Sequence, residues 1–239
     1  MKKLILILAI FMSTNIFMKT TAADFEKDVF KTSGGDLTIT FIKHASLMME
    51  YAGKVIQIDP VGQYADYSKF PKADLILITH EHGDHFDLNA IKQLLKPTTD
   101  VILTKTCAER YPEGKVMSNG DIATFQGIRI EAVPAYNLEK SFHPKGRGNG
   151  YVITFGDKKV YVAGDTENIP EMANLKNIDI AFLPMNLPYT MTPEMVAEAA
   201  RMFKPKILYP YHYGNTDTSK LLDLMKNDKE IEVRIRQLQ

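Results

Sequence analysis

A short polar segment that directly follows an apolar run constrains the fold of this chain more than any other feature. Residues 78–87 read ITHEHGDHFD, and Asp74–Ile78 form a nearly continuous apolar run, typical of a strand buried on both faces. Four side chains able to bind a metal ion fall within six positions of this segment: His80, His82, Asp84 and His85. The first two project to one side of an extended chain, and Gly83 permits a sharp turn that directs the other two toward a second position. We therefore expect a loop, after a buried strand, that can hold two neighbouring metal ions.

The distribution of histidines argues against a polar loop with chance histidines. The chain has six histidines, and three of them lie in this one segment. Each of the others follows or adjoins an expected strand, where the loops of one site would gather: His44, His143 and His212. Imidazole nitrogens and carboxylate oxygens suit zinc, manganese or iron, so the pattern predicts a metal site.

Residues 1–23 have the layout of a signal peptide. A positive start, Met1–Lys3, precedes the unbroken apolar run Leu4–Met12, and small residues at Thr20–Ala23 offer a cleavage site after Ala22 or Ala23. The apolar run is shorter than the roughly 20 residues that a membrane-spanning helix needs. We therefore expect cleavage and export, to the periplasm or as a secreted protein, with no stable membrane anchor afterwards.

Residues 24–239 have the length of a single domain, and no linker rich in proline, glycine or serine divides them. Loss of Lys2, Lys3 and Lys19 with the signal would leave 26 basic and 29 acidic residues. The chain has no dense run of lysine and arginine, so we expect no nucleic-acid partner. Cys107 is the single cysteine, which excludes an intramolecular disulfide, and its apolar neighbours favour a small buried residue over a nucleophile.

The pattern of the chain predicts two packed β-sheets with helices outside them, an α/β fold. Asp87 and Thr192 are expected to cap helices that run over Leu88–Leu95 and from Pro193 to Phe203, and a third helix is expected over Ser219–Lys226. Strands are expected at Leu37–Phe41, Ser46–Tyr51, Val55–Asp59, Asp74–Ile78, Val101–Leu103, Ile128–Val133, Gly150–Phe155, Val160–Ala163, Ile178–Leu183, Ile207–Tyr209 and Ile231–Ile235.

Several motifs in order make the chain similar to a known superfamily. His80-x-His82-x-Asp84-His85 resembles the signature of the metallo-β-lactamase-fold metallohydrolases, and the other motifs of that superfamily are matched by Asp59-Pro60, Gly164-Asp165-Thr166 and Tyr211-His212-Tyr213-Gly214. Phe41–Ser46 resembles a stretch of the branch that contains ascorbate-6-phosphate lactonase and the N-acyl phosphatidylethanolamine phospholipase D enzymes. The resemblance covers nearly all of residues 24–239 and implies a four-layer αββα sandwich. It says little about the substrate, because this fold hosts many chemistries.

The resemblance also implies a set of metal ligands. The first ion would be held by His80, His82 and a third histidine, the second by Asp84, His85 and His212, with Asp165 bridging the two. The chain departs from the pattern where the third histidine is expected, because it reads Tyr136-Asn137 there. The ligand could be the Asn137 carbonyl oxygen or His143, which we favour, or the first site could be incomplete. The implied cofactors are two divalent ions, zinc first, with manganese or iron as alternatives.

The implied chemistry is hydrolysis of an ester, lactone or phosphodiester by a metal-bound hydroxide. Asp84 would bind its metal and help orient the nucleophile. The leaving group would be protonated by metal-bound water, or by His44 if that residue reaches the pocket and is not structural. The substrate would be a small or lipid-like molecule. A protein that keeps the fold and binds a metal or ligand without turnover is the alternative, and the sequence leaves the oligomeric state open.

Four further residues or segments carry expectations. Asp59 is expected to orient the metal loop or a ligand imidazole, and Glu81 to face solvent because side chains alternate. Residues 146–150 are expected to form a flexible loop near the site. Residues 185–191 either line the pocket beside an apolar part of the substrate or fill the core.

Overall fold

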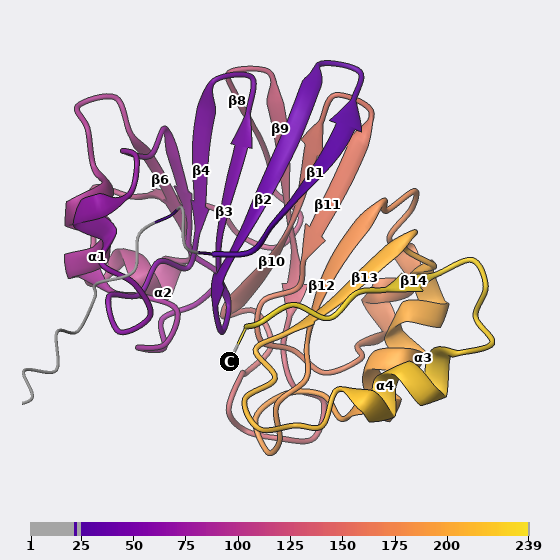
Figure 1. Ribbon diagram of the computed structural model, residues 1–239. Coiled ribbons are helices and arrows are strands. Elements are labelled where there is room, and N and C mark those ends of the chain that lie inside the picture. The colour runs from indigo at the N-terminus through magenta and orange to yellow at the C-terminus, as the bar shows by residue number, and fades with distance from the viewer. Residues whose placement is uncertain (1–21, 23–24, 239) are drawn as a thin grey trace, which may run out of the picture.

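The computed structural model describes Ala22 and residues 25–238, so the predicted signal peptide lies almost entirely outside the described residues. Two seven-stranded sheets face each other, and they form the centre of the molecule (Figure 1). Within the described residues, no helix is both long and apolar enough to cross a membrane.

The first sheet runs in sequence order from β1 to β7. Its first four strands pair antiparallel and its last four pair parallel. The turn between β3 and β4 is made by Ala52 and Gly53, both with positive φ, as a two-residue hairpin turn of the favoured twist requires. Its strands are β1 (Lys27–Thr32), β2 (Gly35–Lys43), β3 (Ser46–Tyr51), β4 (Lys54–Ile58), β5 (Leu75–Leu77), β6 (Asp100–Leu103) and β7 (Lys115–Val116).

The second sheet repeats this arrangement, with β8 to β11 antiparallel and β11 to β14 parallel. In each sheet the parallel strands therefore end at one common edge, the place where α/β proteins gather functional loops. Its strands are β8 (Ile122–Phe125), β9 (Ile128–Ala135), β10 (Gly148–Phe155), β11 (Lys158–Val162), β12 (Ile180–Pro184), β13 (Ile207–Tyr211) and β14 (Glu232–Val233).

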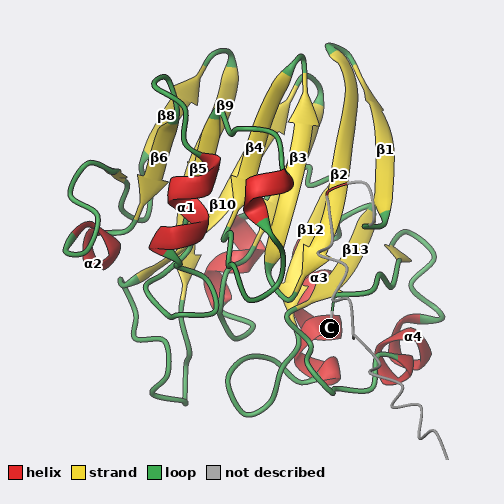
Figure 2. Ribbon diagram, turned by 60° about the vertical axis from the view of Figure 1, so that its left-hand side comes forward, coloured by secondary structure: helices red, strands yellow, loops and turns green. Residues whose placement is uncertain are grey.

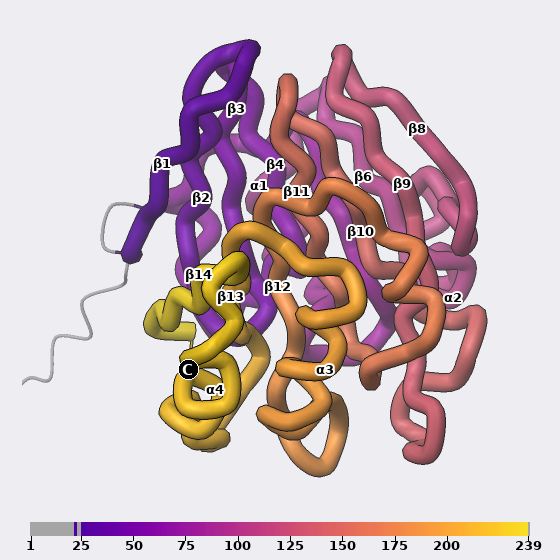
Figure 3. Tube along the Cα trace, turned by 90° about the vertical axis from the view of Figure 1, so that its right-hand side faces the viewer, coloured from indigo at the N-terminus to yellow at the C-terminus, as the bar shows by residue number. Residues whose placement is uncertain are grey.

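Helices cover the outer faces of both sheets, which gives the predicted four-layer αββα sandwich (Figures 1 and 2). Figure 3 shows α3 and α4 together on the flank of the second sheet. The side chains of Asp87 and Thr192 accept backbone hydrogen bonds at the N-termini of α1 and α3, as predicted. The helices are α1 (Leu88–Leu94), α2 (Lys105–Ala108), α3 (Pro193–Phe203) and α4 (Ser219–Met225), with 3₁₀ turns η2 (Tyr67–Lys69) and η3 (Pro170–Asn174).

The apolar run before the metal loop is buried on both faces, as its composition predicts. Leu75 and Leu77 belong to the core between the sheets. Ile76 and Ile78 belong to a second core, which Leu94 of α1 also joins. A strand fixed from both sides gives the loop that follows it a rigid base.

Some expected elements differ from those observed. The strands β1, β7 and β8 and the helix α2 were not predicted, and the expected strand at Ile231–Ile235 is reduced to β14. The flexible loop expected at residues 146–150 is wrong for residues 148–150, because β10 already begins at Gly148. A Cβ on Gly148 or Gly150 would lie 3.0 or 2.8 Å from a backbone oxygen, so these glycines serve close strand packing rather than mobility.

A partly buried ion cluster connects the first strand to residues near the end of the chain. Asp28 of β1 forms an ion pair with Arg236 at 2.7 Å and approaches Arg234 at 3.5 Å. The hydroxyl of Tyr209 also donates a hydrogen bond to Asp28. Burial alone would raise the pKa of Asp28, but these hydrogen bonds and charges hold it below its usual value.

We predict that Asp28→Asn lowers the free energy of unfolding at neutral pH by about 2 kcal/mol, the size of a lost charged hydrogen bond. Because the pKa of Asp28 is lower in the folded state, its contribution is present above the unfolded value near 4 and disappears as pH falls through the folded value. Urea unfolding of both proteins at neutral pH and near pH 3 measures this difference, which should shrink at the lower pH. Asp36→Asn, which breaks the exposed Lys31–Asp36 pair, is the matched control and should cost little. An equal loss in both variants would contradict the assignment.

Candidate metal centre

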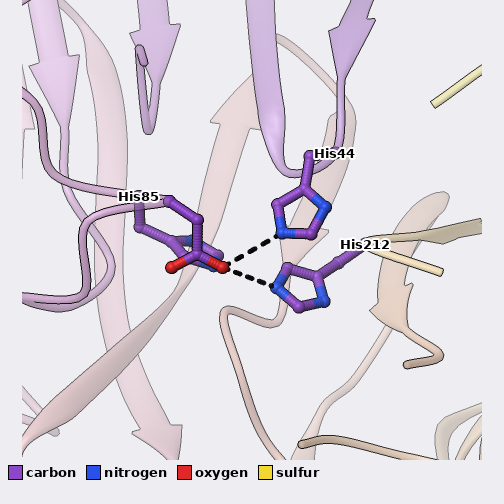
Figure 4. Close-up of side chains that lie close together, drawn as sticks. His44, His85 and His212 are labelled. Carbon is purple, nitrogen blue, oxygen red and sulfur yellow. Dashed lines mark hydrogen bonds and ion pairs between the residues drawn. The ribbon is translucent and has the colours of Figure 1, made fainter. Parts of the chain in front are cut away.

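All seven predicted ligand residues meet at one edge of the two sheets, where strands of both sheets end. The first sheet supplies the loop His80–His85 after β5. The second supplies His143 between β9 and β10, Asp165 after β11 and His212 after β13. Figure 4 shows His44, His85 and His212 close together, each carried by a separate segment. Residues more than 160 positions apart are thus brought together by the two-sheet topology.

A buried carboxylate fixes the base of the metal loop. One oxygen of Asp59 accepts a hydrogen bond from the backbone N–H of Thr79 at 2.8 Å, and the other accepts one from the Thr79 hydroxyl at 2.6 Å. The second oxygen also lies 2.8 Å from Nδ1 of His85. Asp59 therefore orients both the loop backbone and an imidazole, as expected from its position, and directs Nε2 of His85 away from itself.

Asp165 is the point on which the histidines converge. Its carboxylate oxygens lie 3.2 Å from Nε2 of His143 and 3.3 Å from Nε2 of His212. They also lie 3.4 Å from Nε2 of His85 and 3.9 Å from Nε2 of His80. A carboxylate with two oxygens can bridge two ions that each bind some of these imidazoles.

Three groups of side chains have ligand atoms close enough to share an ion. The ligand atoms of each group lie within 4.8 Å of one another. These distances fit two adjacent cations with Asp165 beside both. The groups are His80 with His82 and His143, His80 with His85 and Asp165, and His44 with Asp84, His85 and His212.

The buried ring nitrogens lack the hydrogen bonds that burial normally demands. Among the described residues, Nε2 of His80, His85, His143 and His212 and one oxygen of Asp165 have no hydrogen-bond partner. Each such atom costs about 1–3 kcal/mol when it is left unsatisfied. Their convergence is explained if cations satisfy them, and the donor set of imidazoles and carboxylates fits divalent ions of the zinc type.

The electrostatics of the site favour the metal-binding protonation states of His80, His82 and Asp165. Burial, together with the nearby His85, holds the pKa of His80 well below its ordinary value. Burial also lowers the pKa of His82, helped by the neighbouring His143. Burial would raise the pKa of Asp165, but His212 and His85 hold it well below its usual range. Burial would lower the pKa of His85, but the carboxylates of Asp165 and Asp59 raise it well above its ordinary value, so we expect a metal that binds Nε2 of His85 to displace a proton.

The structure places His143, and not Asn137, beside the first group of histidines. The ring of His143 lies 5.0 Å from that of His82 and 5.1 Å from that of His80, between centroids. Oδ1 of Asn137 lies 2.7 Å from Nδ1 of His143 and accepts a hydrogen bond from its backbone N–H at 2.9 Å. Its amide group donates to the carbonyl oxygen of Tyr189. Asn137 thus orients the His143 imidazole, as partners of metal-binding histidines commonly do.

His44 lies at the open side of the site. Its Nε2 is 3.1 Å from an oxygen of Asp84, and the Asp84 side chain is 43% exposed. Burial lowers the pKa of His44, and the hydrogen bond to Asp84 opposes that change. A neutral, partly exposed imidazole beside Asp84 is placed to exchange a proton with a bound molecule.

Unusual backbone conformations concentrate at the site. His44, Asp59 and His212 have positive φ, a conformation that costs a non-glycine residue about 1–3 kcal/mol. The backbone N–H of His212 donates a hydrogen bond to the carbonyl oxygen of His44 at 3.0 Å. The backbone N–H of His44 donates one to the carbonyl oxygen of Leu238 at 2.9 Å. Gly164 also has positive φ, and a Cβ there would lie 2.8 Å from a backbone oxygen. These contacts hold the ligands at angles that ordinary strand ends would not give.

Sequence reasoning missed or misjudged several neighbours of the site. Thr79 and Tyr64 were not singled out, yet Thr79 contacts Asp59, and the Tyr64 ring lies 5.3 Å from that of His44. The expectation that Glu81 faces solvent is wrong, because it pairs with Arg147 at 2.6 Å and accepts a hydrogen bond from Thr106. In the sequence, only the position of Glu81 between two ligands indicated these contacts, because Arg147 and Thr106 are remote from it along the chain.

Comparison with known proteins identifies the family. Residues 38–212 match the β-lactamase superfamily domain. A UPF0173 metal-dependent hydrolase of Pelotomaculum thermopropionicum is 32% identical over 74% of this chain and 85% of its own length. The crystal structure of an inferred metal-dependent hydrolase of Parabacteroides distasonis has a TM-score of 0.88 and 56% identity, covering 90% of this chain and all of that one. A metallo hydrolase of Ignicoccus hospitalis shares the fold, with a TM-score of 0.73 and 24% identity.

We predict that Asn137→Ala weakens metal binding by roughly 10- to 100-fold, the usual effect of losing a partner that orients a ligand. His143→Ala should weaken it further and lower the number of ions bound. Competition with a chromogenic chelator measures both affinity and stoichiometry. Asn168→Ala, which removes an exposed hydrogen bond to Glu198, is the matched control and should bind as the unchanged protein does. Unaltered affinity in Asn137→Ala would show that Asn137 does not support the site.

Proposed function

This chain belongs to the β-lactamase superfamily, and from that membership we propose that it hydrolyses an ester, lactone or phosphodiester bond with the help of two divalent metal ions. Its relatives are named metal-dependent hydrolases, and the chain is a metallohydrolase of this superfamily. The nature of the bond, the number of ions and their identity are the parts that we propose. Zinc suits the imidazole-rich donor set best, with manganese or iron as alternatives.

One observation carries the proposal. The buried carboxylate of Asp165 faces four imidazole nitrogens at 3.2–3.9 Å, and those nitrogens have no hydrogen-bond partner among the described residues. We assign His80, His82 and His143 to one ion, Asp84, His85 and His212 to the other, and Asp165 to both. Ions held there would supply a Lewis acid and a water molecule that loses its proton near neutral pH.

The exposed side of the site supports a direction of substrate entry. Asp165, His85 and His212 are buried, whereas Asp84 is 43% exposed and His44 is partly exposed. The reacting bond would therefore lie over Asp84 and His44. Asp84 orients what binds at its oxygens, and the His44 imidazole can give a proton to the departing oxygen.

The cellular location of the enzyme is also part of the proposal. The N-terminal sequence pattern supports export to the periplasm or secretion, and a small or lipid-like substrate suits such a location. A binding protein without turnover is the competing function. It would also bind metals, so only a pair of variants that separates metal binding from turnover discriminates the two.

We predict that His82→Ala and His44→Gln both abolish most hydrolysis but differ in metal content. His82→Ala should lose metal along with activity, because it removes a ligand. His44→Gln should keep its metal, and its kcat should fall about 10²- to 10⁴-fold, the usual contribution of a general acid or base to the rate. Elemental analysis and turnover of p-nitrophenyl esters and bis(p-nitrophenyl) phosphate, measured on the same samples, test this.

Surface substitution Lys220→Ala, in the exposed part of α4, is the control and should change neither quantity. Metal-loaded unchanged protein that turns over none of these substrates would favour the binding protein. Full activity in His44→Gln would remove its proton-transfer role.

A further inference from the structure

Two exposed aromatic side chains form a pair beside the metal centre. Phe142 is 41% exposed and Tyr189 is 45% exposed, although large apolar side chains are normally buried. Their ring centroids are 5.0 Å apart at an interplanar angle of 69°, which is a favourable edge-to-face arrangement. The Phe142 ring lies 6.5 Å from that of His143. An apolar surface therefore adjoins a residue that we assign to the first ion.

Hydrogen bonds fix the two loops that carry this pair. The Asn137 amide donates to the carbonyl of Tyr189 at 3.1 Å, and Nζ of Lys140 donates to the carbonyl of Thr190 at 2.6 Å. Leu138 and Leu187, one in each loop, are also exposed. The aromatic pair is thus held in place before any ligand arrives, as a specificity surface requires.

The positive charges of the same region are already neutralised. Lys140 pairs with Glu167 at 2.7 Å, Lys145 with Glu171 at 2.8 Å and Arg147 with Glu81 at 2.6 Å. Residues 185–191 carry no charge, and the loops at residues 61–66, 164–169 and 213–218 contain no lysine or arginine. A phosphate group would normally be met by such side chains. The loops named here therefore offer apolar area and no unpaired lysine or arginine, and Lys43, next to His44, is a basic residue outside them.

We propose that Phe142 and Tyr189 bind an apolar acyl or aryl group next to the reacting carbonyl, so that the substrate is a neutral carboxylic ester or lactone. This inference rests on the proposed hydrolase function and selects among its candidate substrates. In the reaction, the oxygen of water forms a new bond to the acyl carbon and the ester C–O bond breaks. One proton of the water goes to the departing oxygen, and the other is released with the carboxylate product.

The test compares p-nitrophenyl acetate, p-nitrophenyl hexanoate and bis(p-nitrophenyl) phosphate on the metal-loaded enzyme. We expect kcat/KM for the hexanoate to exceed that for the acetate by about tenfold or more, because added methylenes become buried. Phe142→Ala and Tyr189→Ala should each lower this ratio several-fold. The kcat/KM for the acetate and the metal content should change little. Tyr189→Phe should keep the ratio, because the ring rather than the hydroxyl makes the contact.

Two control variants sharpen the comparison. Leu222→Ala removes a similarly exposed apolar side chain from α4 and should leave the ratio unchanged. Lys43→Ala removes a basic residue next to His44 that has no ion-pair partner among the described residues, and it should not affect ester hydrolysis. A preference for the phosphodiester that Lys43→Ala weakens would overturn the proposal, as would a chain-length ratio that survives in both Phe142→Ala and Tyr189→Ala.

A binding measurement separates this proposal from the proposed function. Saturation-transfer NMR with hexananilide and acetanilide, amides that mimic the esters, reports binding without turnover. We expect stronger transfer to hexananilide, lost in Phe142→Ala. Such binding together with no hydrolysis of any substrate would support the apolar site and contradict the hydrolase. Hydrolysis with equal transfer to both amides, unchanged in Phe142→Ala, would contradict the apolar site alone.

Discussion

The burial of one carboxylate governs the construction of this protein. Asp165 is almost fully buried, where an isolated carboxylate would be very costly. Four imidazoles from both sheets surround it at 3.2–3.9 Å, and their Nε2 atoms have no hydrogen-bond partner among the described residues. The carboxylate and the imidazoles do not satisfy one another's hydrogen-bonding capacity. We therefore interpret the cluster as a shared binding site for cations. The strained backbone at His44, Asp59 and His212 is then the cost of aiming these side chains at one point.

The two sheets make that convergence possible because hydrogen bonds join them at the edge where the ligands lie. The N–H of Asn149 donates to the carbonyl of Thr79 at 2.9 Å, and the Tyr151 hydroxyl donates to the carbonyl of Ile78 at 2.8 Å. Both acceptors lie directly before the metal loop. Gly164 completes the junction, since any side chain there would meet the backbone of Asn149. The ligands of the first sheet are therefore held in register with those of the second.

Local patterns in the sequence were enough for much of this arrangement. The apolar run before His80 predicted a strand buried on both faces, and the capped helices α1 and α3 follow from Asp87 and Thr192. The histidine spacing predicted a metal loop, and the structure brings the remaining expected ligands to it. Short edge elements such as β1 and β8 were missed, because a half-exposed strand has little apolar signal of its own.

Contacts between residues that are distant along the chain could not be predicted from the sequence alone. Asn137 and His143 both stood as candidates for one ligand, and only their geometry shows one orienting the other. Glu81 looked solvent-exposed by alternation, yet Arg147 lies across from it in the folded chain. The pairing of Phe142 with Tyr189 likewise joins two loops whose proximity depends on the whole fold.

Anomalous X-ray diffraction at the zinc edge, from crystals of the zinc-loaded protein, would locate each ion in the site directly. We predict two anomalous peaks about 3.5–4 Å apart, both next to the carboxylate of Asp165. One peak would lie among His80, His82 and His143, and the other among Asp84, His85 and His212. A single peak, or peaks away from Asp165, would contradict a shared two-metal centre.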